Sequence, residues 1–150
     1  MKKILCCILT AMLFFNVMTV CANATETNTK TMFFSDGSYA TIELFMREIR
    51  ASGSKTGTKV YTYYNSDSIS QWKAVLTGSF TYTGSNATCI SASMDVTIYD
   101  SSWYTISKFA TKSENIATGS ASIGEKVGGV TVMRIPVDLT LTCDSNGNLR

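Results

Sequence analysis

The chemistry open to this chain is limited first by the absence of histidine from its 150 residues. Imidazole serves as the general base in Ser-His-Asp and Cys-His catalysis, and it is a common ligand of zinc. A sequence without histidine cannot form a Ser-His-Asp site, a Cys-His site or a zinc site that contains histidine. Other side chains would have to supply a base, a nucleophile or a set of metal ligands.

A serine nucleophile activated by lysine is the next chemistry to consider. The S-x-x-K spacing occurs at 52–55 and again at 70–73, and a K-T-G triplet overlaps the first of these at 55–57. In penicillin-binding enzymes these motifs lie far apart and are accompanied by an S-D-N triplet. Here two of them overlap in one short stretch and S-D-N is missing, so we predict no catalytic serine.

Carboxylates occur in two close pairs, Glu43 with Glu48 and Asp95 with Asp100. A glycosidase holds two carboxyl groups roughly 5 to 9.5 Å apart across a cleft. The chain has 11 acidic residues spread along its length, and pairs of this kind arise by chance at that density. We therefore interpret them as surface acids and predict no catalytic residues.

The segment 144–148, DSNGN, superficially resembles a calcium loop. An EF-hand loop needs glycine at its sixth position and a bidentate glutamate at its twelfth, whereas glycine is fourth here. We predict a simple turn in this segment. No metal site and no cofactor are expected.

The first 24 residues have the features of a secretory signal peptide. Two lysines precede an apolar run at 4–20, and an Ala-Asn-Ala exit ends at residue 24. We expect cleavage there, a secreted extracellular product, and one domain over 25–150 without a membrane span. The alternative is a lipid anchor on Cys21, but the bulky Val20 before it does not fit a lipoprotein signal.

The exported chain is expected to carry no net charge. Removal of the two N-terminal lysines leaves 11 basic residues beside 11 acidic ones, and the basic residues form no cluster in the sequence. Binding to nucleic acid or to an anionic membrane surface requires a basic patch. Neither is therefore expected as a partner.

Two cysteines, Cys89 and Cys143, remain after signal removal. In an oxidising compartment they can form one intramolecular disulfide, and they are too few for a four-cysteine zinc site. On the chain-entropy account, such a bridge would remove roughly 4 kcal/mol of unfolded-chain entropy. The alternative is a pair of buried free thiols.

Aromatic side chains are the one candidate binding surface, because their rings offer large, rigid contact area to sugars or peptides. The candidates for this platform are Tyr61, Tyr63, Tyr64, Trp72, Trp103 and Tyr104. Trp72 is in phase with Leu76 and Phe80, so we assign it to the core. We keep Tyr61, Tyr63, Tyr64 and Tyr104 as a weak platform, with Tyr64 and Tyr104 as its exposed members and a glycan or a protein surface as its partner.

The elements that position these side chains are organised around the stretch 71–100, which we predict to be one long β-hairpin. Apolar and polar residues alternate over 72–83, and Gly84-Ser85-Asn86 makes the turn. In the return arm, the residues on the shared apolar face are Ile90, Ala92, Met94, Val96 and Ile98. Cys89 would then lie on the opposite face, so we expect a β-bulge near it.

The segments before this hairpin are less regular. Residues 39–49 fit both strand and helix periodicity, and we favour a strand because an Asp-Gly turn precedes them and no helix cap is clear. Residues 25–31 are polar and lack periodicity, which predicts a mobile lead-in. Residues 50–57 are rich in Gly and Ser, which predicts a loop.

Seven to nine short strands, at turn spacings of about ten residues, predict an antiparallel β-sandwich that is immunoglobulin-like in outline. A small closed barrel is the alternative. The small residues of 116–127 would place that strand close to a neighbouring backbone or at a sheet edge. Pro136 predicts an edge or a local break in pairing for the last strand, since proline cannot donate to a ladder.

Several segments carry a resemblance to a known family: FFSDGSYATIEL, then FTYTGSNATC, and finally LTLTCDSNGNL. In these the chain resembles a family of small secreted proteins from Gram-positive bacteria of the clostridial group. The resemblance covers essentially the whole mature chain, and the pairing of FTYTGSNATC with LTLTCDSNGNL is its most specific part. It implies origin, export and fold, but no activity.

The sequence thus favours an exported, non-enzymatic β-sandwich that acts as an extracellular binding or surface-associated module. A secreted bacteriocin-like or toxin-like effector is the alternative, in view of the small size, the export signal and the pair of cysteines.

Overall fold

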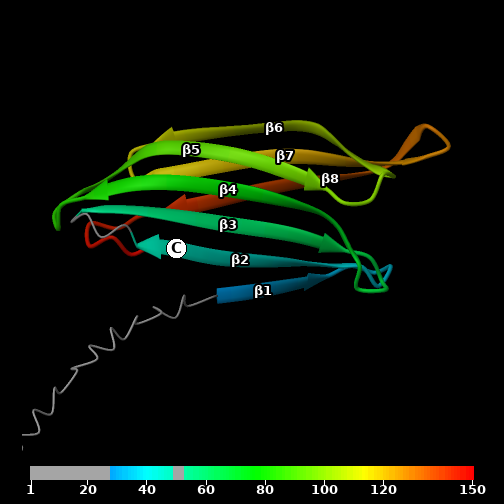
Figure 1. The fold of residues 1–150 in the computed structure, drawn as a ribbon, viewed down its shortest axis with the longest axis horizontal. Coiled ribbons are helices and arrows are strands. Elements are labelled where there is room, and N and C mark those ends of the chain that lie inside the picture. Colours follow the sequence, from blue (N-terminus) through cyan, green and yellow to red (C-terminus); the bar gives the residue numbers. More distant parts are fainter. Residues whose placement is uncertain (1–27, 49–52) are drawn as a thin grey trace, which may run out of the picture.

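The chain folds as two antiparallel sheets in a computed structural model that describes residues 28–48 and 53–150. The strands are β1 (Asn28–Phe33), β2 (Tyr39–Glu48), β3 (Ser54–Tyr64), β4 (Ser70–Tyr82), β5 (Ala87–Ile98), β6 (Trp103–Ser113), β7 (Ile116–Val127) and β8 (Val130–Thr142). The larger sheet has the order β1-β2-β3-β4-β5 and the smaller has β6-β7-β8, so neighbours in each sheet are also neighbours in the chain (Figure 1). The predicted antiparallel β-sandwich is confirmed. The described strands form two separate sheets rather than one closed sheet.

The central hairpin is formed by β4 and β5, as the alternation predicted, and it contains the expected bulge. Ser79 faces Ser91 and Phe80 faces Cys89, so Ile90 has no partner in the register. The bulge turns the Ile90 side chain out to 48% exposure and places Cys89 among the buried residues. The prediction that Ile90 shares the buried face of Met94 is therefore wrong, because the extra residue shifts the alternation by one position.

Strand β2 confirms the strand that we favoured for 39–49, as far as Glu48. The structure corrects the boundaries of two other segments. The polar segment that we expected to be a mobile lead-in forms part of β1 from Asn28, because it pairs along β2. Similarly, the predicted loop at 50–57 becomes strand from Ser54, which pairs with Thr81 of β4. The predicted signal peptide at 1–24 lies outside the described residues, as do the parts of the other predicted segments that fall at 25–27 and 49–52.

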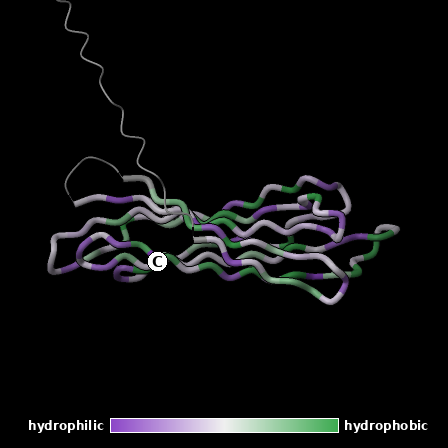
Figure 2. The backbone as a smooth tube through the Cα atoms, turned by 90° about the horizontal axis from the view of Figure 1, so that it is seen from below, coloured by the Kyte–Doolittle hydropathy of each residue, from purple (hydrophilic) through white to green (hydrophobic). Residues whose placement is uncertain are grey.

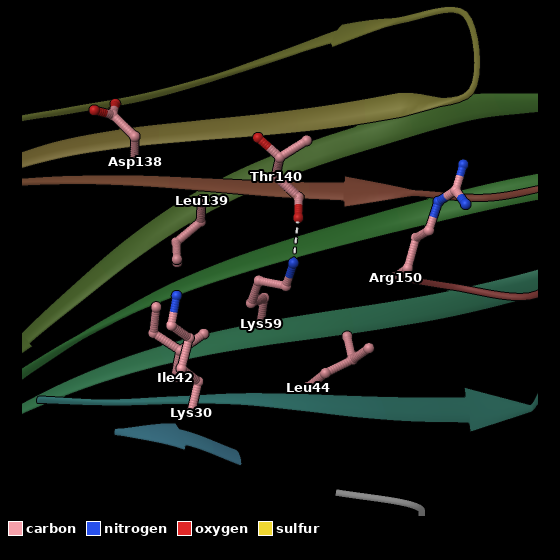
Figure 3. Close-up of a pocket in the computed structure, with 8 residues that line it drawn as sticks. All are labelled: Lys30, Ile42, Leu44, Lys59, Asp138, Leu139, Thr140 and Arg150. Atoms are coloured by element: carbon pink, nitrogen blue, oxygen red, sulfur yellow. Dashed lines mark hydrogen bonds between the residues drawn. The ribbon is translucent and has the colours of Figure 1, made fainter. Parts of the chain in front are cut away.

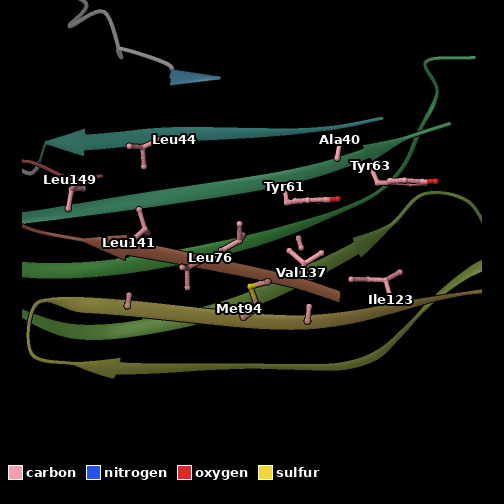
Figure 4. Close-up of a cluster of buried hydrophobic side chains, with 14 of the residues drawn as sticks. Ala40, Leu44, Tyr61, Tyr63, Leu76, Met94, Ile123, Val137, Leu141 and Leu149 are labelled. Atoms are coloured by element: carbon pink, nitrogen blue, oxygen red, sulfur yellow. The ribbon is translucent and has the colours of Figure 1, made fainter. Parts of the chain in front are cut away.

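The core lies between the two sheets and takes side chains from both. Its largest fully buried members are Trp72, Phe80, Leu76, Ile123, Leu141 and Cys143. Figure 4 shows the labelled core residues projecting from the two sheets toward one another. Burying one large apolar side chain contributes about 1.5 to 3 kcal/mol. The position of Trp72 agrees with its phase in the sequence.

The small residues of β7 lie in the middle of the smaller sheet, where they make room for the larger sheet. A Cβ on Gly119 would lie 2.8 Å from the sulfur of Met94 and 2.9 Å from Cδ1 of Leu76. Strand β7 therefore approaches the larger sheet closely, although the nearest atoms at Gly119 belong to side chains and not to a neighbouring backbone. The alternative of an edge strand is wrong. Strand β8, which contains Pro136, is an edge strand as predicted.

The sandwich is closed along one side and open along the other. Strand β5 approaches β6 and β7, and β8 approaches β3 and β4, but β1 and β2 make no close backbone contact with the smaller sheet among the described residues. Figure 1 shows these two strands projecting past β8. Figure 2 shows the strands running the length of the molecule, with hydrophobic and hydrophilic residues alternating along them. The inner face of β2 consequently borders an opening.

Within the two described ranges, no helix is long and apolar enough to cross a membrane.

Candidate functional site

Two of the four predicted platform tyrosines belong to the core. Tyr61 and Tyr63 point inward from β3 and are 5% and 4% exposed. Both rings stack on that of Trp72, with centroid distances of 5.4 Å and 5.3 Å. Burial raises the pKa of Tyr61 to about 12, and the neighbouring Tyr63 adds to the increase. These two side chains hold the sheets together and are not available as a binding surface.

The other two tyrosines lie on different sheets. Tyr64 stacks on Tyr39 of β2, with ring centroids 4.7 Å apart. Tyr104 lies on the smaller sheet, where its hydroxyl is 2.6 Å from Oγ1 of Thr131 and the Nζ of Lys126 sits 4.1 Å from its ring centroid. The four tyrosines therefore do not form one platform.

Three of the carboxylates considered in the sequence, Asp95, Asp100 and Asp144, make local contacts. Asp95 forms an ion pair with Lys108, whose Nζ donates a hydrogen bond to Oδ1 of Asp95 at 2.9 Å. Asp100 caps a turn by accepting hydrogen bonds from the hydroxyl and the amide of Ser102, and these bonds lower its pKa. In the same way, Asp144 accepts hydrogen bonds from amides within its own turn. Each carboxylate stabilises a local structure.

Cys89 and Cys143 are buried near each other as unbonded thiols. The pKa of the Cys143 thiol is raised, and burial is the largest cause. The carboxylate of Asp144 and the thiol of Cys89 add to the increase. Burial also raises the pKa of Cys89. The main-chain amides of the two cysteines donate to carbonyl groups of the same turn, that between β6 and β7, so the two residues lie on either flank of that turn.

A groove of about 470 Å³ lies on the open side of the sandwich, between β2 and the free edge of β8. It is lined by Lys30, Ile42, Leu44, Lys59, Asp138, Leu139, Thr140 and Arg150. Figure 3 shows aliphatic side chains on both walls, with Lys30 and Lys59 projecting between them. Sites for small ligands in proteins commonly have volumes of a few hundred Å³ and apolar walls with a few polar groups.

Lys59 is a charged residue on the inner face of β3. Side chains alternate along a strand, so it points the same way as Tyr61 and Tyr63. Its Nζ reaches across the opening and donates to the main-chain oxygen of Thr140 at 2.6 Å (Figure 3). Burial lowers the pKa of Lys59. An ammonium group carries three N–H donors, so two remain for a ligand.

Cations outnumber acids in this groove. Lys30, Lys59 and Arg150 line it together with one carboxylate, that of Asp138. Oδ1 of Asp138 accepts a hydrogen bond from Oγ of Ser120 at 2.5 Å, and Figure 3 shows the Asp138 side chain turned away from the two lysines. Positive charge next to apolar walls attracts an anion more strongly than the same charge in open water. The groove can therefore hold an anionic group that is attached to an apolar body.

The sequence interpretation missed this groove, although one signal for it was present. Lys59 is in phase with Tyr61 and Tyr63, and a lysine on an apolar strand face is unusual unless it has a partner or a function. Lys30 was assigned to a lead-in, so its position beside Ile42 in the register could not be anticipated.

A second hollow, of about 160 Å³, lies at the end of the sandwich that carries the β1–β2 and β3–β4 turns. Its polar groups already bind one another. The hydroxyl of Tyr63 donates to Oγ of Ser38, and the Ser38 hydroxyl donates to Oδ1 of Asp36 at 2.6 Å. Oδ1 of Asn65 accepts hydrogen bonds from two amides of its own turn. This hollow is smaller than the groove, and its groups serve to close the turns.

The groove is thus a concave surface in the described part of the chain at which lysine N–H groups without a protein partner lie next to apolar side chains. Comparison with family models, curated proteins and solved structures found no match to this chain.

Proposed function

We propose that this protein is a secreted, non-enzymatic binding module that holds an anionic ligand with an apolar portion in the groove between β2 and β8. The observation that carries the proposal is the position of Lys59. Its ammonium sits beside Leu44 and Leu139, bonds to one carbonyl, and has donors to spare. Burial disfavours the charged form of this ammonium and so lowers its pKa, and an anion bound next to it would offset that cost.

Export belongs to the same proposal. The basic start, apolar middle and small-residue exit of 1–24 support secretion of 25–150 as an extracellular domain. The resemblance to small secreted proteins of clostridial bacteria points the same way and stays a prediction. In an extracellular setting, the partner of the groove is a carboxylated glycan or an acidic segment on a protein surface.

A Cys89–Cys143 disulfide in the exported protein is the third part of the proposal. Both thiols are buried, and the main-chain amides of the two cysteines bond to consecutive carbonyl groups of the β6–β7 turn. An oxidising compartment favours the bond between such neighbours. The bridge would link β5 of the larger sheet to the end of β8 in the smaller one.

Titration of the purified exported protein with matched charged and neutral probes tests the function. The charged probes are octanoate and polygalacturonate, and their neutral counterparts are octyl glucoside and dextran. At least one charged probe should bind, and its affinity should fall as salt is added. The Lys59→Gln variant should bind it about tenfold more weakly, which corresponds to about 1.4 kcal/mol.

Lys73→Gln is the matched control, since Lys73 lies on β4 outside the groove, next to the ring of Tyr99. It should bind like the parent protein. The proposed function is wrong if neutral probes bind as well as charged ones, or if Lys59→Gln and Lys73→Gln behave alike.

A secreted effector is the second candidate, and one end of the sandwich favours it. The turns that join β1 to β2, β3 to β4, β5 to β6 and β7 to β8 gather there (Figure 1). Several large apolar side chains in or beside these turns are exposed: Phe33, Ile69, Tyr99, Val127, Val130 and Val132. Exposed apolar patches often mark contact surfaces. Growth inhibition of neighbouring Gram-positive strains by the purified protein, lost in Val130→Ser plus Val132→Ser, would favour this candidate over the passive binder.

A further inference from the structure

We infer that the ligand of the groove is an extended peptide segment that adds as a strand to the free edge of β8 and places acidic side chains against Lys30 and Lys59. This inference rests on the proposed function and specifies the chemistry of the ligand. It follows from the direction of the β8 backbone groups, from a pairing that the chain already makes on the same edge, and from the charges that face it.

The direction of the backbone groups comes from the hydrogen bonds at the end of β8. The amide and the carbonyl of Thr142 both bond to Arg150, on the side away from β7. In an antiparallel strand, the N–H and C=O of every second residue point to the same side. Thr140 and Asp138 therefore direct their amides and carbonyls to the same free edge, and the bond from Lys59 to the Thr140 oxygen agrees with this.

Pro136 has the same phase but has no amide to donate. The receptive part of the edge is thus bounded by Pro136 at one end and by the Thr142–Arg150 pair at the other. An exposed edge of this kind is a template for pairing with another chain.

The chain itself provides an example of what this edge accepts. Thr142 and Arg150 exchange two backbone hydrogen bonds, of 3.0 Å and 3.1 Å, and Cys143 pairs with Leu149 as an antiparallel bridge. The Leu149 side chain is buried, and it fills the space that a side chain on Gly57 of β3 would take. A short extended segment therefore already sits on β8 with an apolar side chain directed into the opening. Arg150 of this segment also lines the groove.

The side chains that face the groove define the sequence of the ligand. Lys30 lies opposite Ile42 in the register, and Lys59 lies opposite Leu44. A strand added to β8 would direct every second side chain toward these two pairs, because its side chains alternate. Those inward positions would be taken by aspartate or glutamate together with aliphatic residues. The bond from Lys59 to Thr140 need not break, since a carbonyl oxygen can accept two hydrogen bonds.

Selection from a display library of random linear heptapeptides tests the inference on the full exported protein. In the enriched peptides, every second position should carry either an acidic or an aliphatic residue. The best peptide is then resynthesised with N-methyl groups at the amides of alternate residues, in both phases. One phase should weaken binding at least about tenfold, since it removes backbone donors worth roughly 1.4 kcal/mol or more in total. The other phase should bind like the parent peptide.

A variant of the receiving edge gives an independent measurement. Thr140→Pro removes one outward amide and should weaken the peptide about tenfold, the effect of losing one hydrogen bond without a replacement. Pro136 shows that β8 accommodates proline in this phase. Arg134→Pro is the matched control, because Arg134 directs its amide to the same edge as Thr140 but lies beyond Pro136, outside the receptive part. Amide exchange offers a readout that does not depend on either variant: the amides of Asp138 and Thr140 should become protected on binding.

The outcomes separate the two proposals. If both N-methylated phases bind like the parent peptide, or if the amides of Asp138 and Thr140 stay unprotected, strand addition is wrong while the anion-binding groove survives. If no peptide is enriched but octanoate or polygalacturonate binds through Lys59, the ligand is not a peptide. If no charged probe and no peptide depends on Lys59, the proposed function itself fails. Dimerisation of the protein through β8, detected by its sedimentation, would assign the edge to a second copy instead and would also overturn the inference.

Discussion

Cys89 and Cys143 donate their main-chain amides to two consecutive carbonyl groups, those of Glu114 and Asn115, at 2.6 Å and 3.0 Å. The two cysteines come from different sheets, and the β6–β7 turn fixes both of their backbones. A disulfide between them would therefore form on a backbone that is already held in place.

The first prediction concerns this bridge. The exported protein should gain the mass of two hydrogen atoms on reduction, and reduction should lower its free energy of unfolding by about 4 kcal/mol or less, the entropy of the closed loop. Mass spectrometry and urea unfolding with and without reductant provide the measurement. The Cys89→Ser plus Cys143→Ser protein, which should not respond to reductant, is the control. An unchanged mass would mean that the thiols stay free.

The second prediction is a loss of stability in alkaline solution. The pKa of Tyr61 is raised from 10.0 to about 12 in the folded chain, so the folded state keeps a proton that the unfolded state releases above pH 10. Stability should therefore be fully present below pH 10 and fall as the pH rises from 10 toward 12, by up to about 1.4 kcal/mol per pH unit for this group. Urea unfolding at several pH values measures it. Tyr61→Phe should show a shallower fall than the parent protein, whereas Tyr64→Phe should match the parent.

The third prediction tests the bulge in β5. Deletion of Ile90 should leave the fold intact, because Cys89 and Ser91 already face consecutive residues of β4. Deletion of Ser93 should instead be severely destabilising, since it would move the buried Met94 to the opposite face. Circular dichroism and thermal melts distinguish the two. Equal damage from both deletions would show that the bulge is needed for the fold.

The fourth prediction concerns the approach of the two sheets. Gly119→Ala should destabilise the protein by about 1 to 3 kcal/mol, because the new methyl group would overlap the side chains of Leu76 and Met94. Thr118→Ala, one residue earlier and on the opposite face of β7, should change stability by no more than about 0.5 kcal/mol. Urea unfolding of both variants measures the difference. If Gly119→Ala is as stable as the parent, the sheets have room to move apart there.

Local alternation explains why some of this structure could be predicted. Trp72, Leu76 and Phe80 share one phase, and that phase alone was enough to place β4 and its buried face. The position of Cys89 one residue out of phase was also enough to predict the bulge. These inferences needed only neighbouring residues in one hairpin.

The missed features depend on contacts between distant segments. Strand β1 is polar and becomes a strand by pairing with β2, which its own sequence does not reveal. Tyr61 and Tyr63 were assigned to a surface, since nothing local shows which face of β3 meets the second sheet. The same is true of Lys59, whose partner Thr140 lies on the last strand.

The separation of the sheets along the chain has a consequence for how an exported molecule of this kind would assemble. All strands of the larger sheet precede Asp100, and all strands of the smaller sheet follow it. Hairpin partners that are close in sequence can form early, because the loops they close are short. The larger sheet can therefore form before the second half of the chain has folded. The second half of the chain would then fold against a sheet that has already formed. The edge of β8, the last strand in the order of the chain, would be the last part to pack.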